Sequence, residues 1–136
     1  GDGSKTTPWM IPGLPFAHRI DTSRSTQFKR DTYAGCQGIP DVGGPEFEYT
    51  ITMSETRRVR AFVLADTDVD VDLFLLESTA QTDNCLVRGG RSLSRLLVEG
   101  STYRFVVDTR TFEGSPQWGE ATLIIHPCGE NDPVCS

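Results

Sequence analysis

The clearest candidates for chemistry form a run in the middle of the chain, where acidic and other residues alternate: Asp66, Asp68, Asp70 and Asp72. In an extended strand alternate side chains point to one side, so the four carboxylates would stand in a row about 6–7 Å apart. Carboxylate oxygens are ligands that Ca²⁺ prefers, so the run is a candidate calcium site. A straight strand cannot aim four side chains at one ion, and Asp66 and Asp68, nearest to the turn, are the better candidates.

The same carboxylate row has a second explanation that needs no ion. Arg58 and Arg60 lie on one face of the strand expected just before it and could pair with the aspartates across a hairpin. We prefer this interpretation, in which the aspartates form an arginine-paired, solvated face. No cofactor is then required, and calcium is the alternative.

The residue types that usually build a catalytic centre do not form a recognisable set in this chain. It has two histidines, His18 and His126, which lie far apart in the sequence. It contains no Gly-x-Ser-x-Gly elbow, no HExxH zinc helix and no phosphate-binding glycine loop. We therefore expect a protein that is not an enzyme and assign no catalytic residue.

Three aromatic residues in or beside expected loops are candidate ligand-binding residues: Trp9, Phe112 and Trp118. Exposed rings could stack on the faces of sugars, which would suit a carbohydrate-binding surface. Alternatively, the same rings close the open end of a sandwich or anchor the N-terminal segment, which is the commoner use of such residues.

Four cysteines stand at positions 36, 85, 128 and 135, too widely spaced for paired CxxC zinc ligands. An even number in a loop-rich chain predicts two disulfides and hence an oxidising compartment. Four cysteines allow three pairings, of which we favour Cys36–Cys85 with Cys128–Cys135, since the second would close a short polar loop. An extracellular, periplasmic or surface-anchored location follows.

Composition and charge narrow the classes of partner. The chain of 136 residues is the size of one domain, and its 19 acidic against 13 basic residues give a net charge of −6. That charge disfavours nucleic acid as a partner. No apolar run approaches the roughly 18 residues of a membrane-spanning helix. We expect a monomer without a transmembrane segment.

The elements that must position these residues are short strands separated by turns, at intervals of roughly 8–12 residues. Two segments alternate most clearly, with inner faces formed by Phe47, Tyr49, Ile51 and Met53 and by Val69, Val71, Leu73 and Leu75. The segment 92–98 is equally compatible with a strand and a helical turn. The pattern predicts an all-β fold, a jelly-roll-like antiparallel β-sandwich of about eight strands. It would span residues 14–128, after a flexible N-terminal segment (1–13) and before a cysteine-containing C-terminal tail (129–136).

Several short motifs follow one another in a familiar order: 44–49, 69–75, the hairpin 97–108, and Gly119 with Thr122 and Leu123. In this order the chain resembles the bacterial pre-peptidase C-terminal (PPC) domain and related surface-protein domains. Thr122 stands where that pattern has a closing tyrosine. The resemblance implies a jelly-roll-like sandwich that serves as a non-catalytic accessory module of secreted proteins. Some such domains bind polysaccharide or collagen, and some hold Ca²⁺.

Two functions are compatible with these observations. The first is a non-catalytic secreted or cell-surface binding module whose partner is a polysaccharide or an extracellular matrix polymer. The second is a structural or interaction domain of a surface lipoprotein, stabilised by disulfides and calcium, with no small ligand.

Overall fold

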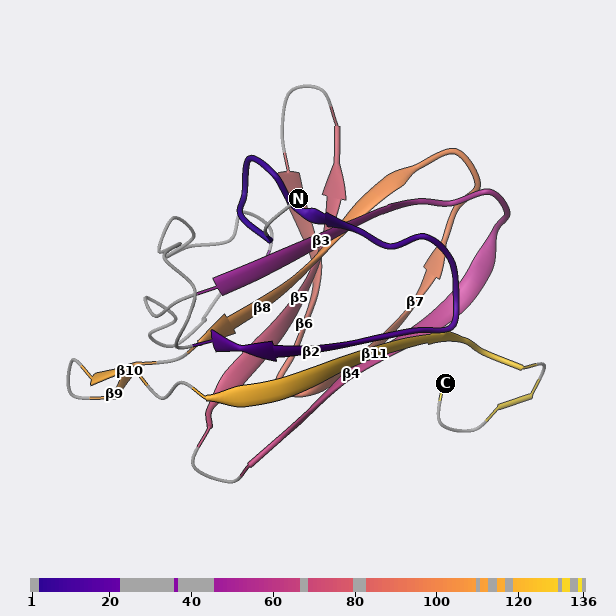
Figure 1. Ribbon diagram of the computed structural model, residues 1–136. Coiled ribbons are helices and arrows are strands. Elements are labelled where there is room, and N and C mark those ends of the chain that lie inside the picture. Colours follow the sequence, from indigo (N-terminus) through magenta and orange to yellow (C-terminus); the bar gives the residue numbers. More distant parts are fainter. Residues whose placement is uncertain are drawn as a thin grey trace.

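The computed structural model describes residues 3–22, 36, 46–66, 69–79, 83–109, 111–112, 115–116, 119–129, 131–132 and 135. These residues form two β-sheets that pack face to face (Figure 1). The all-β sandwich expected from the sequence is thus confirmed. No helix in this part of the chain is long and apolar enough to cross a membrane.

One sheet has five strands and the other has four. The five-stranded sheet has the order β1-β3-β8-β5-β6, with bounds Trp9–Met10, Glu46–Thr52, Thr102–Thr109, Val71–Ser78 and Asp83–Gly89 in that order. The four-stranded sheet has the order β2-β11-β4-β7, with bounds Phe16–Asp21, Glu120–Pro127, Arg57–Ala65 and Ser92–Leu97. A short pair, β9 (Thr111–Phe112) and β10 (Ser115–Pro116), belongs to neither sheet. The ambiguous segment 92–98 is therefore a strand.

The chain crosses between the sheets at almost every turn. Strand β3 lies in the five-stranded sheet, β4 in the four-stranded sheet, and β5 in the five-stranded sheet again. Within the two main sheets, β5 and β6 are the one pair of described strands that are both consecutive in sequence and hydrogen-bonded to each other. Strands that follow each other thus face each other across the core, and their outward side chains point to opposite sides of the molecule.

The core between the sheets is built from the alternation seen in the sequence. The inner faces predicted for β3 and for the aspartate segment are confirmed, since all eight apolar residues are buried in one cluster. The four-stranded sheet supplies Val59, Ala61, Val63, Leu123 and Ile125 to the same cluster. Period-two alternation places these side chains on one side of each strand.

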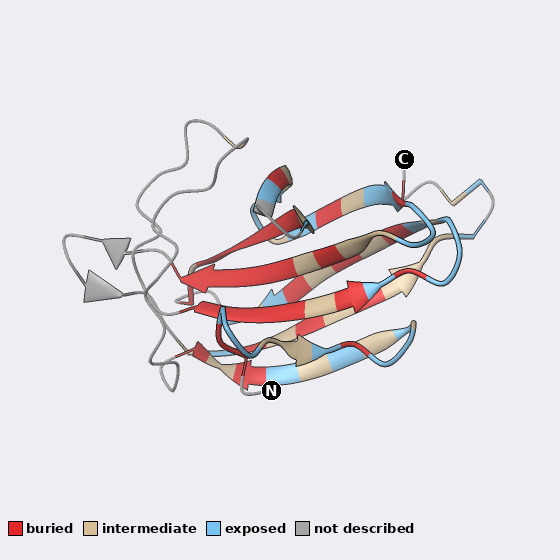
Figure 2. Cartoon of the chain, turned by 90° about the horizontal axis from the view of Figure 1, so that it is seen from above, coloured by how far each residue is buried: buried red, intermediate tan, exposed pale blue. Residues whose placement is uncertain are grey.

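Burial on the outer sides differs between the two sheets (Figure 2). Strand β5 is buried at six consecutive positions and β8 at its last five, so both are covered on two sides. In β4 and β11 buried positions alternate with more exposed ones. The five-stranded sheet is therefore covered on its outer side near these residues, and the four-stranded sheet is open there.

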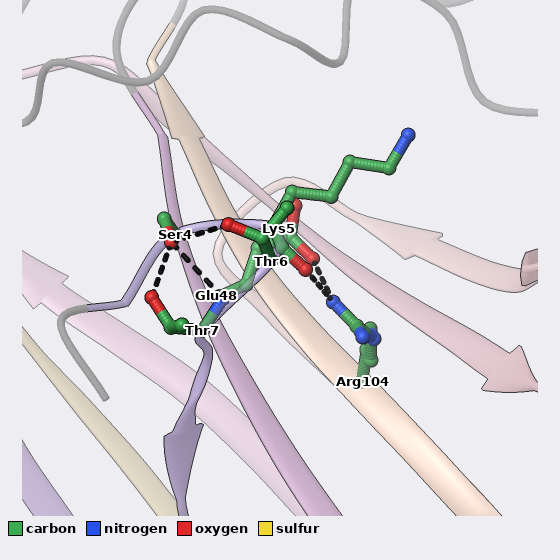
Figure 3. Close-up of polar contacts among 6 residues, drawn as sticks. All are labelled: Ser4, Lys5, Thr6, Thr7, Glu48 and Arg104. Atoms are coloured by element: carbon green, nitrogen blue, oxygen red, sulfur yellow. Dashed lines mark hydrogen bonds and ion pairs between the residues drawn. The ribbon is translucent and has the colours of Figure 1, made fainter.

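The N-terminal residues belong to the sandwich, which corrects the boundary drawn at residue 14. Strand β1 pairs with β3 and is the one parallel neighbour in an otherwise antiparallel arrangement. The Trp9 ring stacks on Phe47 with centroids 4.9 Å apart. Residues 3–7 fold beside β3, where Ser4 bonds to Thr6 and Thr7 (Figure 3). Pairing and ring stacking fix this segment against the sheet.

Both predicted disulfides are confirmed. Cys36 is joined to Cys85 of β6, 49 positions away, and Cys128 to Cys135, seven positions away. The long-range bond attaches Cys36 to the outer side of the five-stranded sheet, where it packs against Phe74, Leu76 and Val106. The short-range bond closes a ring after β11.

Candidate ligand-binding face

The outer side of the five-stranded sheet buries an unusual number of carboxylates. We call closed face the seven outward residues that are almost fully buried there: Glu46, Glu48, Asp72, Phe74, Leu76, Val106 and Asp108. Three of these carboxylates are direct cross-strand neighbours, since Asp108 pairs with Glu46 on one side and with Asp72 on the other. Like charges at directly opposed positions repel each other, so this face depends on compensating contacts.

Two arginines supply part of that compensation. Arg88 of β6 lies 3.2 Å from Asp72, and Arg104 of β8 lies 3.0 Å from Glu48. Arg104 also donates a hydrogen bond to the Lys5 carbonyl oxygen at 2.6 Å, which ties the N-terminal segment to this face (Figure 3). Because the partners are largely removed from solvent, loss of either one would leave a buried charge without this partner and would strongly destabilise the fold.

The aspartate run does not stand in one solvated row. Asp66 is exposed, Asp70 is half-buried, and Asp72 is 1% exposed. Asp68 lies outside the described residues. No three His, Cys, Asp or Glu side chains converge on a common point in the part of the chain that is described. The calcium site at Asp66, Asp68, Asp70 and Asp72 stays a prediction.

The preferred explanation of that run named the wrong arginines. Arg58 and Arg60 belong to β4 in the four-stranded sheet, so they cannot pair across a hairpin with a strand of the other sheet. The arginine that pairs with the run is Arg88, which reaches Asp72 from β6. The error came from treating strands that follow each other in sequence as neighbours in one sheet.

The outer side of the four-stranded sheet has the opposite character. We call it the open face, and its outward residues are Ala17, Arg19, Asp21, Arg58, Arg60, Phe62, Leu64, Ser92, Ser94, Leu96, Glu120, Thr122, Ile124 and His126. Leu64 and Leu96 are among the most exposed apolar residues described, at 57% and 47%. Register places Ala17, Ile124, Phe62 and Ser92 in one line across the four strands. That line is largely apolar and about 14 Å long.

Phe62 is at the centre of this face. The Arg60 guanidinium carbon lies 4.4 Å from the centroid of the Phe62 ring, within the range of a cation–π contact. His126 presents an edge-to-face contact to the same ring, with centroids 6.1 Å apart. A cation–π contact does not use the N–H donors of the guanidinium in hydrogen bonds, so they can bind an external acceptor.

The two ends of the open face differ. At one end a shallow hollow of about 360 Å³ is lined by Leu64, Asp66, Thr122 and the ion pair of Arg19 with Glu120. At the other end lies the ring closed by Cys128 and Cys135. The Cys128 amide donates to the Arg58 carbonyl oxygen, and the Ser94 hydroxyl donates to the Cys135 carbonyl oxygen. This disulfide ring borders the face beside Arg58 and Arg60, neither of which pairs with a carboxylate in the part of the chain that is described.

The predicted aromatic ligands do not lie on this face in the described part. Trp9 is half-buried, stacked on Phe47 and 4.5 Å from the His18 ring, so it acts as an anchor. Trp118 and the side chain of Phe112 lie outside the described residues. The sequence-based analysis missed Arg60, Phe62 and His126. The available signal was the presence of large apolar residues on both faces of β4.

The two histidines do not build a catalytic centre in the described residues. His18 Nδ1 is 2.7 Å from the buried Tyr49 hydroxyl, and burial lowers the pKa of His18 and raises the pKa of Tyr49 above its ordinary value. His126 Nδ1 lies 3.1 Å from the carbonyl oxygen of Pro127. Neither imidazole contacts a carboxylate or a serine among the described residues.

A second hollow, of about 320 Å³, opens at the end of the sandwich. Ile11, Leu14, Ile51 and Met53 line it, together with the ion pair of Arg57 and Glu55. Both hollows are at the small end of the range for ligand pockets.

Comparisons with known proteins support the fold. No protein-family model and no curated protein matches the sequence. The chain is similar in structure to PliG of Aeromonas hydrophila, a periplasmic inhibitor of g-type lysozyme, with a TM-score of 0.54 and 9% identity over 94% of this chain and 100% of that one. It is also similar to the pre-peptidase C-terminal domain of a Bacillus anthracis collagenase, with a TM-score of 0.52 and 14% identity over 88% of this chain and 94% of that one. The resemblance to the PPC domain is therefore confirmed for the fold.

Proposed function

We propose that this protein is a non-catalytic binding module of the cell exterior, and that its open face binds a polysaccharide or an extracellular matrix polymer. The observation that carries the proposal is the environment of Phe62. This ring lies on the solvent side of a sheet, in a line of apolar side chains, with Arg60 and His126 in contact with it. A flat surface that joins an aromatic ring to polar groups suits a ligand that is itself partly apolar and partly polar.

The fold and the disulfides support this assignment. One structural neighbour is named as a periplasmic lysozyme inhibitor and another as the pre-peptidase C-terminal domain of a collagenase, so similar folds occur in an inhibitor protein and in a domain of a larger enzyme. Two disulfides are typical of proteins that work in oxidising surroundings. An extracellular, periplasmic or surface-anchored location follows from the same argument.

A binding screen tests the proposal. The full chain is assayed against immobilised polysaccharides and collagens, together with Phe62→Ala and with Met10→Ala as a matched control. Met10 is 78% exposed and lies on β1 of the other sheet, so its removal also takes away an exposed apolar side chain. We expect at least one immobilised polymer to retain the wild-type protein and the Met10→Ala variant but not the Phe62→Ala variant. Retention by all three variants, or by none, would contradict the proposal.

The alternative function, a structural domain stabilised by calcium at the aspartate run, has its own test. An ion that binds only the folded chain raises the Tm by mass action. Calcium at Asp66, Asp68 or Asp70 therefore predicts a higher Tm in CaCl₂ than in EDTA, and a smaller difference in Asp70→Asn. Identical melts in CaCl₂ and in EDTA would exclude this role for calcium.

A further inference from the structure

We infer that the polymer bound by the open face is a polysaccharide that carries carboxylate groups, and this inference rests on the proposed function. It is carried by the distribution of charge over the two sheets together with the position of the Arg60 guanidinium. Neither feature follows from net charge, because the chain as a whole is acidic at −6.

The charges of the described residues are unevenly distributed. Four carboxylates are buried on the closed face, where Arg88 and Arg104 pair with two of them. On the open face Arg58 and Arg60 follow each other at alternate positions of β4, about 7 Å apart. Neither has a carboxylate partner among the described residues, whereas Arg19 is paired with Glu120. An acidic protein thus presents on its open face two arginines that form no ion pair with any described carboxylate.

The Arg60 side chain is already held in a binding geometry. Its guanidinium rests on the Phe62 ring, so less side-chain freedom is lost when a ligand binds. A guanidinium over an aromatic ring can still donate N–H hydrogen bonds to an external acceptor. The fork formed by these N–H groups matches the two oxygens of a carboxylate.

The surroundings of Arg60 favour a sugar polymer as the bearer of that carboxylate. The apolar line through Ile124 and Phe62 can accept the less polar face of a sugar ring. Hydroxyl groups of Ser92 and Thr122 lie at the same line and in the next row, where they can bond to sugar hydroxyls. A chain lying along the line would have Arg60 on one flank and Arg19 on the other.

The test compares two forms of one polymer. Polygalacturonate carries a carboxylate on each sugar, and its fully methyl-esterified form has the same backbone without the charge. We expect the wild-type chain to bind polygalacturonate at least about tenfold more tightly than the ester, the difference that one charge-assisted hydrogen-bond pair makes. Binding should weaken as NaCl is added, because salt screens exposed charges.

Variants separate the arginine from the aromatic ring. Arg60→Ala should lose about tenfold in affinity for polygalacturonate and leave affinity for the ester unchanged. Arg60→Lys keeps the charge but not the planar fork and should recover only part of the loss. Arg95→Ala is the control, because Arg95 is exposed on β7 but shares the strand side of Leu93 and Leu97.

The outcomes distinguish this inference from the proposed function. Equal affinity for both polymers, lost in Phe62→Ala but kept in Arg60→Ala, would overturn the carboxylate assignment and leave the binding module standing. Binding to dextran sulfate or to polyphosphate, with none to polygalacturonate, would also overturn it, since an anion other than a carboxylate would then be recognised. No binding to any polymer would overturn both. Urea unfolding of each variant confirms that the chain is folded.

Discussion

The two outer faces of this sandwich have opposite relations between charge and burial. The closed face holds Glu46, Glu48, Asp72 and Asp108 at 0–1% exposure, among Phe74, Leu76 and Val106. The open face leaves Leu64 more than half exposed and sets the Arg60 guanidinium on a half-buried ring. The closed face thus buries charged side chains, whereas the open face exposes apolar side chains to solvent.

This difference separates stability from binding. A charge buried among apolar side chains stabilises the fold only while its partner is present, so the closed face is where substitutions should unfold the protein. An exposed side chain contributes little to the free energy of folding, so substitutions on the open face should change the stability of the protein only slightly. Residues on such a surface can therefore be selected for ligand binding with little effect on stability.

The largest difference in stability between the two faces should come from removing the disulfides. Replacing Cys36 and Cys85 with serine removes a crosslink between residues 49 positions apart, and chain entropy predicts a loss of about 4 kcal/mol in the free energy of unfolding. The same change at Cys128 and Cys135, seven positions apart, predicts about 2.5 kcal/mol. Urea unfolding of the two double variants measures both values. If the Cys128 and Cys135 variant lost more stability than the Cys36 and Cys85 variant, the closed face would not be the one on which stability depends more.

The next effect concerns one arginine on each face. Arg104→Ala leaves Glu48 buried without this partner and removes the bond to the Lys5 carbonyl oxygen, so the free energy of unfolding should fall by about 3 kcal/mol. Arg60→Ala removes the same charge from the open face and should change it by about 0.5 kcal/mol or less. Urea midpoints of the two variants compare them directly. Similar losses would show that the open face is also structural.

The smallest effect is a pH dependence at the edge where the two sheets meet. His18 of the four-stranded sheet contacts Tyr49 of the five-stranded sheet, and burial lowers the pKa of His18 below its unfolded value of 6.5. The unfolded chain therefore takes up this proton more readily, so the contribution is complete above about pH 6.5 and is lost as pH falls through that value.

A substitution isolates this contribution from that of the carboxylates. The stability of wild type relative to His18→Gln should decrease between pH 7 and pH 5, by less than either change above, because His18 is only partly buried. Urea unfolding of both chains across this range measures the difference. A difference that stays constant, or that grows in favour of wild type on acidification, would contradict the assignment.

Much of the sandwich was predictable because it depends on local alternation. Phe47, Tyr49 and Ile51 had to share a side in any extended chain, and the structure buries all three. The Cys128–Cys135 ring was predictable because its cysteines are close in sequence. The candidate site was only partly predictable: Arg60 and Phe62 alternate on one strand, but no local pattern brings His126 of β11 beside them.

The sequence by itself determined where most of the long strands lie, which side of them faces the core, and that the chain carries two disulfides. Only the tertiary structure decided which outer side is covered. Glu46 and Glu48 alternate with apolar residues as a solvated strand does, yet both are fully buried, and Leu64 looks like a core residue yet is exposed. The reason is that alternation shows which side of a strand is more polar than the other, but not whether the polar side is exposed to solvent in the folded protein. Whether a further segment packs on the outer side depends on contacts between residues distant in sequence, such as Cys36 with Cys85 and Lys5 with Arg104.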